Sequence, residues 1–170
     1  MKKTLPFVVL FISFIAISQN TTNQILGEII QKVSEETQGE DGRWQFVIEE
    51  RTFLCLTDQN NNRMRIMTPI TEVENLSEED LKNALTANFH TALDVKYAIS
   101  NEILWSVFIH PLKELTENQI IDAISQVFYA AETFGTIYSS TNLIFPGNTQ
   151  NKELDEVEPK NTKVLKLQKG

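Results

Sequence analysis

Residues 94–112 read DVKYAISNEILWSVFIHPL, two apolar runs that flank the polar residues Ser100, Asn101 and Glu102. Because this polar patch has the length of a tight turn, the pattern predicts a hairpin of two antiparallel strands. The second strand should end at Pro111, which has no amide hydrogen to donate to a neighbouring strand. The stretch therefore favours a domain built on an antiparallel sheet.

The second strand of this hairpin is apolar on both of its faces. Period-two alternation sends one set of side chains to one face: Leu104, Ser106, Phe108 and His110. The opposite face receives the other set: Ile103, Trp105, Val107 and Ile109. A sheet with one face in water should alternate apolar with polar residues, so we expect the face of Trp105 to be covered. The cover could be the middle helix of the chain, a second subunit or a bound peptide.

Upstream of the hairpin, the sequence predicts a helix followed by three strands. Apolar residues recur at helical spacing, which indicates a helix over about residues 22–37 that ends before Gly39. Three β-rich runs follow, near residues 44–49, 53–56 and 64–70. Their connections are too short for a helical crossover, so the three strands should form a meander.

Two further helices have recognisable capping residues. Ser77 precedes an acidic first turn and should begin a helix that runs to about Phe89. Thr116 and Gln119 form a capping box for a last helix that extends toward Gly135. The expected order is α-β-β-β-α-β-β-α, an α+β domain with a five-stranded antiparallel sheet packed by helices.

Residues 1–18 have the pattern of a signal peptide. Lys2 and Lys3 precede a short apolar run, and the small residues Ala16 and Ser18 suit a cleavage site. The run is shorter than the ~20 apolar residues that span a bilayer. We therefore expect an exported protein, periplasmic or extracellular, that has no membrane attachment after signal cleavage.

Composition limits the partners and the fold of the remaining chain. Fifteen basic and 23 acidic side chains give the whole chain a formal net charge of −8, which becomes −10 without Lys2 and Lys3 and argues against nucleic acid as a partner. Cys55 is the only cysteine, so an intramolecular disulfide cannot form. We expect residues 19–146 to form one domain stabilised by its core, and residues 147–170 to be a largely disordered tail.

No pattern in the sequence predicts catalysis, a cofactor or a metal ion. His90 and His110 are the only histidines, too few for a multi-histidine metal site. Cys55 lies within the alternating run TFLCLT, where a small buried side chain is the ordinary explanation. The stretch DQNNN, residues 58–62, resembles a calcium loop, but Arg63 stands where that loop needs glycine, so we interpret it as a hairpin turn. We therefore expect a non-catalytic protein.

Four segments carry a resemblance to a known group of proteins. They are RWQF at 43–46, RMRIMTPI at 63–70, ALTANFHTALDVKYAI at 84–99 and LWSVFIHPLKELTENQI at 104–120. Together with the element order, they resemble bacterial domains with the type III secretion chaperone-like fold, including those described as sensory transduction regulators. The resemblance implies a small acidic homodimer that binds extended segments of other proteins without a cofactor. Unlike the secretion chaperones, this chain carries a predicted export signal.

Two hypotheses of function follow. The first is an exported, non-catalytic, chaperone-like domain that captures a protein segment or self-associates through the surface of Ile103, Trp105, Val107 and Ile109. Its acidic rim would favour basic partners. The second is a hydrolase or metal-dependent enzyme of an unrecognised type, with residues drawn from His90, His110, Cys55 and the carboxylates. A histidine close to clustered carboxylates would favour the enzyme.

Overall fold

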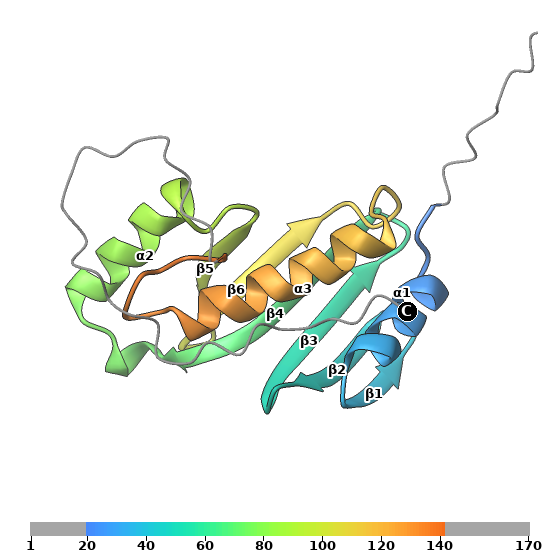
Figure 1. Cartoon of the computed structure of the whole chain (residues 1–170), viewed down its shortest axis with the longest axis horizontal. Coiled ribbons are helices and arrows are strands. Elements are labelled where there is room, and N and C mark those ends of the chain that lie inside the picture. Colours follow the sequence, from blue (N-terminus) through green and yellow to red (C-terminus); the bar gives the residue numbers. More distant parts are fainter. Residues whose placement is uncertain (1–19, 142–170) are drawn as a thin grey trace, which may run out of the picture.

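Six strands form one antiparallel sheet in the computed structural model, which describes residues 20–141 (Figure 1). The strands are β1 (Glu36–Glu40), β2 (Arg43–Ile48), β3 (Arg51–Asp58), β4 (Arg63–Glu72), β5 (Val95–Ser100) and β6 (Ile103–His110). Their order across the sheet is β1-β2-β3-β4-β6-β5. The β5–β6 hairpin therefore joins the meander through β6, and β1 and β5 are the edge strands.

Three α-helices accompany the sheet, with one short 3-10 turn between β4 and the second helix. They are α1 (Asn23–Val33), α2 (Glu78–His90) and α3 (Glu117–Glu132), and the turn is η1 (Val73–Asn75). Ser77 with Asp80, and Thr116 with Gln119, form complete capping boxes at the starts of α2 and α3. The predicted first residues of these two helices are therefore confirmed.

Two-residue turns set the register of three hairpins. Their central residues are Asp41-Gly42, Glu49-Glu50 and Asn101-Glu102, all with positive φ, as in the turns that match the twist of antiparallel strands. At Gly42, an added Cβ would lie 2.4 Å from Thr57 Oγ1 and 2.9 Å from Asn23 Nδ2. This register decides which side chains share a face of the sheet.

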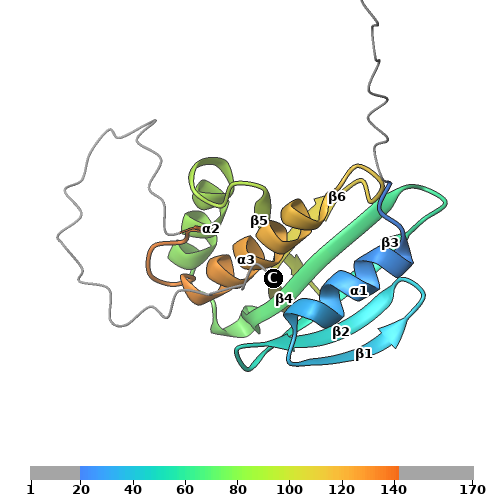
Figure 2. The same ribbon diagram turned by 45° about the vertical axis from the view of Figure 1, so that its right-hand side comes forward.

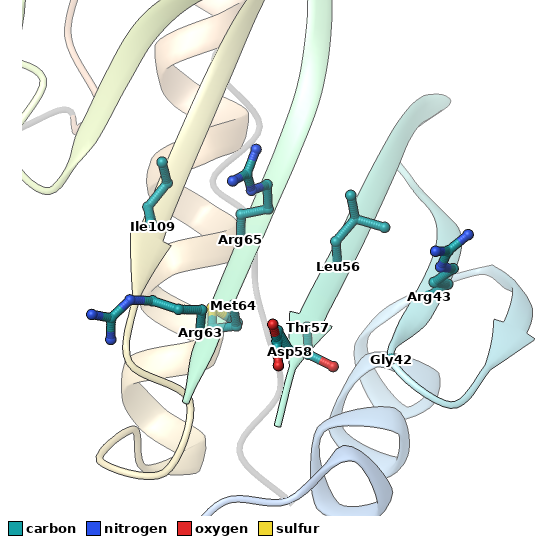
Figure 3. A pocket seen from close by; sticks show the side chains of 9 residues that line it. All are labelled: Gly42, Arg43, Leu56, Thr57, Asp58, Arg63, Met64, Arg65 and Ile109. Carbon is teal, nitrogen blue, oxygen red and sulfur yellow. The ribbon is translucent and has the colours of Figure 1, made fainter. Parts of the chain in front are cut away.

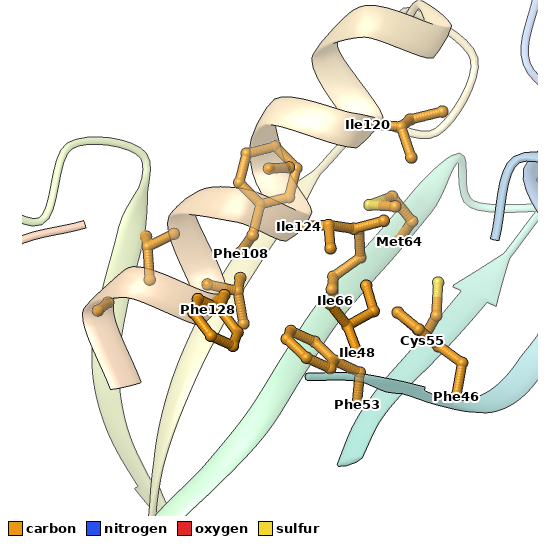
Figure 4. Packing of buried hydrophobic residues seen from close by; sticks show 14 of the residues in the cluster. Phe46, Ile48, Phe53, Cys55, Met64, Ile66, Phe108, Ile120, Ile124 and Phe128 are labelled. Atoms are coloured by element: carbon orange, nitrogen blue, oxygen red, sulfur yellow. The ribbon is translucent and has the colours of Figure 1, made fainter. Parts of the chain in front are cut away.

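Helices α1 and α3 lie against the same face of the sheet (Figures 1 and 2). The core lies beneath them and contains the rings of Phe46 and Phe53, stacked with centroids 5.2 Å apart (Figure 4). Phe108 of β6 belongs to the same core. The buried Ser106 hydroxyl donates to the Val127 carbonyl of α3 at 2.9 Å, so this polar group between strand and helix is satisfied.

Helix α2 packs at the β5 edge of the sheet. The Asn88 side chain bonds both backbone groups of Tyr97: Nδ2 donates to the carbonyl at 3.1 Å, and the Tyr97 N–H donates to Oδ1 at 2.7 Å. Tyr138 follows α3 in the chain, and its hydroxyl donates to Asp80 Oδ1 of α2 at 2.8 Å. These bonds fasten α2 to the sheet edge and to the segment that follows α3.

The α+β class and the antiparallel sheet are as predicted, but two details of the prediction are wrong. The first helix ends at Val33, and the sheet has six strands instead of five, because Glu36–Glu40 forms β1. This segment reads ETQGE and lies at an edge with exposed side chains, so it lacks the apolar alternation of an inner strand. The observed order is α-β-β-β-β-α-β-β-α.

The predicted signal peptide, residues 1–18, and the predicted tail, residues 147–170, lie outside the described residues. Between residues 20 and 141, no helix has the length and apolar character needed to cross a membrane.

Candidate functional site

The sheet face turned away from α1 and α3 carries many apolar side chains. We call it the open face, and its apolar residues are Val47, Leu54, Leu56, Met67, Pro69, Ile103, Trp105, Val107 and Ile109. None of them belongs to the core cluster, whereas Ala84 and Ala87 of α2 do. The middle helix, one of the three expected covers, therefore packs into the core on the other side. No helix within residues 20–141 is left to cover the open face.

Sheet register brings the open-face residues into continuous rows. Leu54 of β3 pairs with Met67 of β4, and Met67 pairs with Val107 of β6. Pro69 lies opposite Trp105 in the next row. Neighbouring strands lie about 4.8 Å apart, so each row spans roughly 10 Å of apolar surface across three strands. The open face thus has an apolar surface, continuous over three strands, that is wide enough for an extended chain.

All four residues predicted to bind a partner lie on this face. Ile103 and Trp105 are half-buried, Val107 is 7% exposed and Ile109 is 58% exposed. The Trp105 Nε1–H donates to the Ser100 carbonyl at 3.1 Å, which satisfies the indole and holds its ring beside the β5–β6 turn. Alternation placed these four side chains correctly, and their role in binding stays a prediction.

Strands β3 and β4 contribute a part of the open face that was not predicted from the sequence. Leu54 and Leu56 alternate with the buried Phe53 and Cys55, so this strand is also apolar on both faces. The signal was present in FLCL, as it was in the second strand of the hairpin. What the sequence did not contain was the pairing of β4 with β6, which joins the two apolar strands.

A pocket of about 480 Å³ lies at one end of the open face. One row of side chains crosses it from strand to strand: Arg43, Leu56, Arg65 and Ile109. Figure 3 shows Leu56 between the two arginines of this row. Arg63 of β4 is a third arginine in the lining. The pocket therefore combines guanidinium groups with an apolar floor.

Two carboxylates lie close to these arginines without forming an ion pair with them. Asp58 lines the pocket, and its carboxylate accepts from the Asn61 side chain at 2.7 Å and from the Asn61 N–H at 3.0 Å. These hydrogen bonds lower the pKa of Asp58, and the bond from the Asn61 side chain has the larger effect. Glu40 of β1 lies opposite Arg43 of β2. The ion pairs within residues 20–141 involve neither Glu40 nor Asp58.

The residues that could have supported catalysis are not brought together. Cys55 is completely buried, and this burial raises the pKa of its thiol to about 12. His110 Nδ1 lies 2.8 Å from the Pro111 carbonyl and its ring stacks on Phe108, while His90 ends α2. Over the described part of the chain, no group of three or more His, Cys, Asp or Glu side chains is placed to hold a metal ion.

The DQNNN segment is a hairpin turn, as interpreted from the sequence. Asn61 bonds Asp58 across the turn, and Asn62 Nδ2 donates to both oxygens of Glu114 at 3.0 and 2.9 Å. Asn62 Oδ1 accepts from the Lys113 N–H at 2.8 Å. These polar side chains attach the β3–β4 turn to the loop before α3.

A second apolar surface lies on α2. Leu85 is 70% exposed and Phe89 is 85% exposed, one helical turn apart on the same side of the helix. The small residues Ala84 and Ala87 occupy the buried side of this helix. The pair is separate from the open face.

Comparison with known proteins gives fold relatives. No family model and no curated protein matches the sequence. A chain of the HopA1–SchA chaperone–effector complex matches with a TM-score of 0.53 and 9% identity, over 65% of this chain and 90% of that one. The Yersinia pestis type III secretion chaperone SycH, solved in complex with a stable fragment of YscM2, matches with a TM-score of 0.52 and 12% identity, over 66% and 98%. The predicted type III secretion chaperone-like fold is therefore confirmed, and the likeness concerns the fold.

Proposed function

We propose that this protein is an exported, non-catalytic, chaperone-like domain that binds an extended segment of another protein on its open face. The observation that carries the proposal is the continuous apolar surface over β3, β4 and β6, which the helices leave uncovered. Extended segments suit such a surface because one side of a strand-like chain can present apolar side chains every second residue.

The fold relatives support the same function. One was solved as a chaperone–effector complex and the other as a chaperone with a fragment of a second protein. The export of this chain rests on the signal pattern of residues 1–18, and periplasm or extracellular space is the proposed location.

A homodimer is part of this proposal, and α2 offers a surface for it that leaves the open face available. Leu85 and Phe89 are exposed apolar side chains of the kind that dimer interfaces bury. Sedimentation of the mature chain, residues 19–170, should give a dimer that dissociates in the double variant Leu85→Ser/Phe89→Ser. A dimer unaffected by this change, or a wild-type monomer, would contradict the role of α2.

Site-specific photo-cross-linking tests the open face directly. One photoreactive phenylalanine analogue is placed at Leu54 on the open face. The same analogue at Leu85 on α2, in the proposed dimer interface, is the comparison and should cross-link only to a second copy of the chain. With an extract of the exported proteins of the source bacterium, Leu54 should cross-link to one continuous segment of a different protein. If position 54 cross-links only to the chain itself, the proposed function is wrong.

A further inference from the structure

Three of the four arginines in the chain line the pocket at the end of the open face. They are Arg43 of β2 and Arg63 and Arg65 of β4, contributed by strands that are not neighbours. The fourth, Arg51, forms an ion pair with Glu132 of α3. The three pocket arginines form no ion pair within residues 20–141. Arg63 Nη1 donates to the Asn62 carbonyl at 3.0 Å, which leaves the guanidinium groups of Arg43 and Arg65 as the main candidates to bind an anionic partner.

The pocket is positive although the protein is acidic. Its lining holds three arginines and one carboxylate, Asp58, against a formal net charge of −8 for the chain. The Asp58 oxygens accept hydrogen bonds from Asn61, and Asp58 forms no ion pair with Arg63, its partner on β4, within residues 20–141. At physiological ionic strength, charges more than about 8 Å apart are largely screened, so a bound chain responds mainly to the arginines it touches.

The arginines are also placed beside the apolar residues that a bound chain would contact. Arg43 and Arg65 lie on either side of Leu56 in one row, about 10 Å apart across two strand spacings. The next row along the strands contains Leu54 and Met67. A guanidinium group binds a carboxylate with two parallel hydrogen bonds, and it does so more strongly where neighbouring apolar groups exclude water.

We propose that the segment bound on the open face is acidic, with aspartate or glutamate and apolar side chains mixed along the one side that faces the sheet. Its carboxylates bind Arg43 and Arg65, and its apolar side chains cover Leu54, Leu56 and Met67. This inference rests on the proposed function and names the chemistry of its partner. An acidic partner is the opposite of what the negative net charge of the chain suggested, which was a basic partner. The difference arises because the acidic residues that determine the net charge lie elsewhere on the surface.

Three rhodamine-labelled peptides test the proposal by fluorescence anisotropy with the mature chain. In each, valine and one polar residue (glutamate, glutamine or lysine) take turns at every second position, with serine between them, so that both kinds of side chain lie on the same side of the extended peptide. The glutamate peptide should bind most tightly, although the net charge of the protein repels it. The double variant Arg43→Gln/Arg65→Gln should weaken its binding at least about tenfold and leave the glutamine peptide nearly unchanged. Lys32→Gln/Lys82→Gln, which removes two charges from α1 and α2, is the matched control and should have little effect.

A charge reversal guards against variants that lose binding because they misfold. Arg43→Glu/Arg65→Glu should shift the preference from the glutamate peptide to the lysine peptide, a gain that a misfolded protein cannot produce. Equal binding of the three peptides, abolished by Trp105→Ala, would overturn the arginine assignment and leave the proposed function standing. A third outcome is that none of the three peptides binds and that the open face is buried in a dimer. This outcome would overturn both the arginine assignment and the proposed function.

Discussion

Phe53 and Leu54 are neighbours in the chain, both apolar, and they have opposite surroundings. Phe53 is completely buried beneath the helices, while Leu54 is half-buried on a face that no described helix covers. The same contrast separates Phe108 from Trp105 on β6. Apolar patterning identifies residues that avoid water, but it does not say whether the chain itself or a partner covers them. That distinction depends on where the helices pack.

The largest expected difference between the faces is in thiol reactivity. Cys55 should react with iodoacetamide at pH 8 only when the domain unfolds, because it is buried and its pKa is raised to about 12. A thiol at the adjacent open-face position, Leu54→Cys with Cys55→Ala, should react in the native state at least about a thousandfold faster. Mass spectrometry of timed samples gives both rates. Similar rates would indicate that the open face is also covered.

The second largest difference between the two faces is expected in the free energy of unfolding. Phe108→Ala leaves a cavity beneath α3 and should reduce the free energy of unfolding by ~3–5 kcal/mol. Trp105→Ala removes a half-buried ring from the open face and should cost less than about 2 kcal/mol, while weakening capture of the glutamate peptide. Urea unfolding of the mature chain measures both. Equal losses, with peptide binding intact, would contradict the assignment of Trp105 to a partner surface.

The sequence predicted the features that depend on local pattern. The β5–β6 hairpin, the two faces of β6 and the Thr116–Gln119 cap all follow from alternation, turn residues and capping chemistry. Strand β1 was missed because ETQGE carries no apolar residue, and the pairing of β4 with β6 joins segments that are distant in the sequence. The pocket was missed for the second reason, since Arg43 and Arg65 share a row only through the register of β2, β3 and β4.

A smaller effect is expected from a single polar contact on the covered face. Ser106→Ala removes the hydrogen bond to the Val127 carbonyl of α3 and should reduce the free energy of unfolding by about 1 kcal/mol. The same substitution at Ser100, whose side chain is exposed at the end of β5, is the control and should change it by less than about 0.5 kcal/mol. Equal losses in urea unfolding would mean that the Ser106 bond contributes little to holding α3 on the sheet.

The smallest change in stability should come from making the centre of the open face polar. In Leu54→Thr/Met67→Thr, threonine supplies the β-branched shape that strands favour, and the side chains it replaces already lie partly in water. We therefore expect the free energy of unfolding to change by less than about 1 kcal/mol, while binding of the glutamate peptide is lost. The mirror variant Phe53→Thr/Ile66→Thr places two hydroxyl groups beneath the helices and should prevent folding. If both double variants unfold, the chain itself covers both faces of the sheet, and the apolar surface of β3, β4 and β6 is core instead of a binding site.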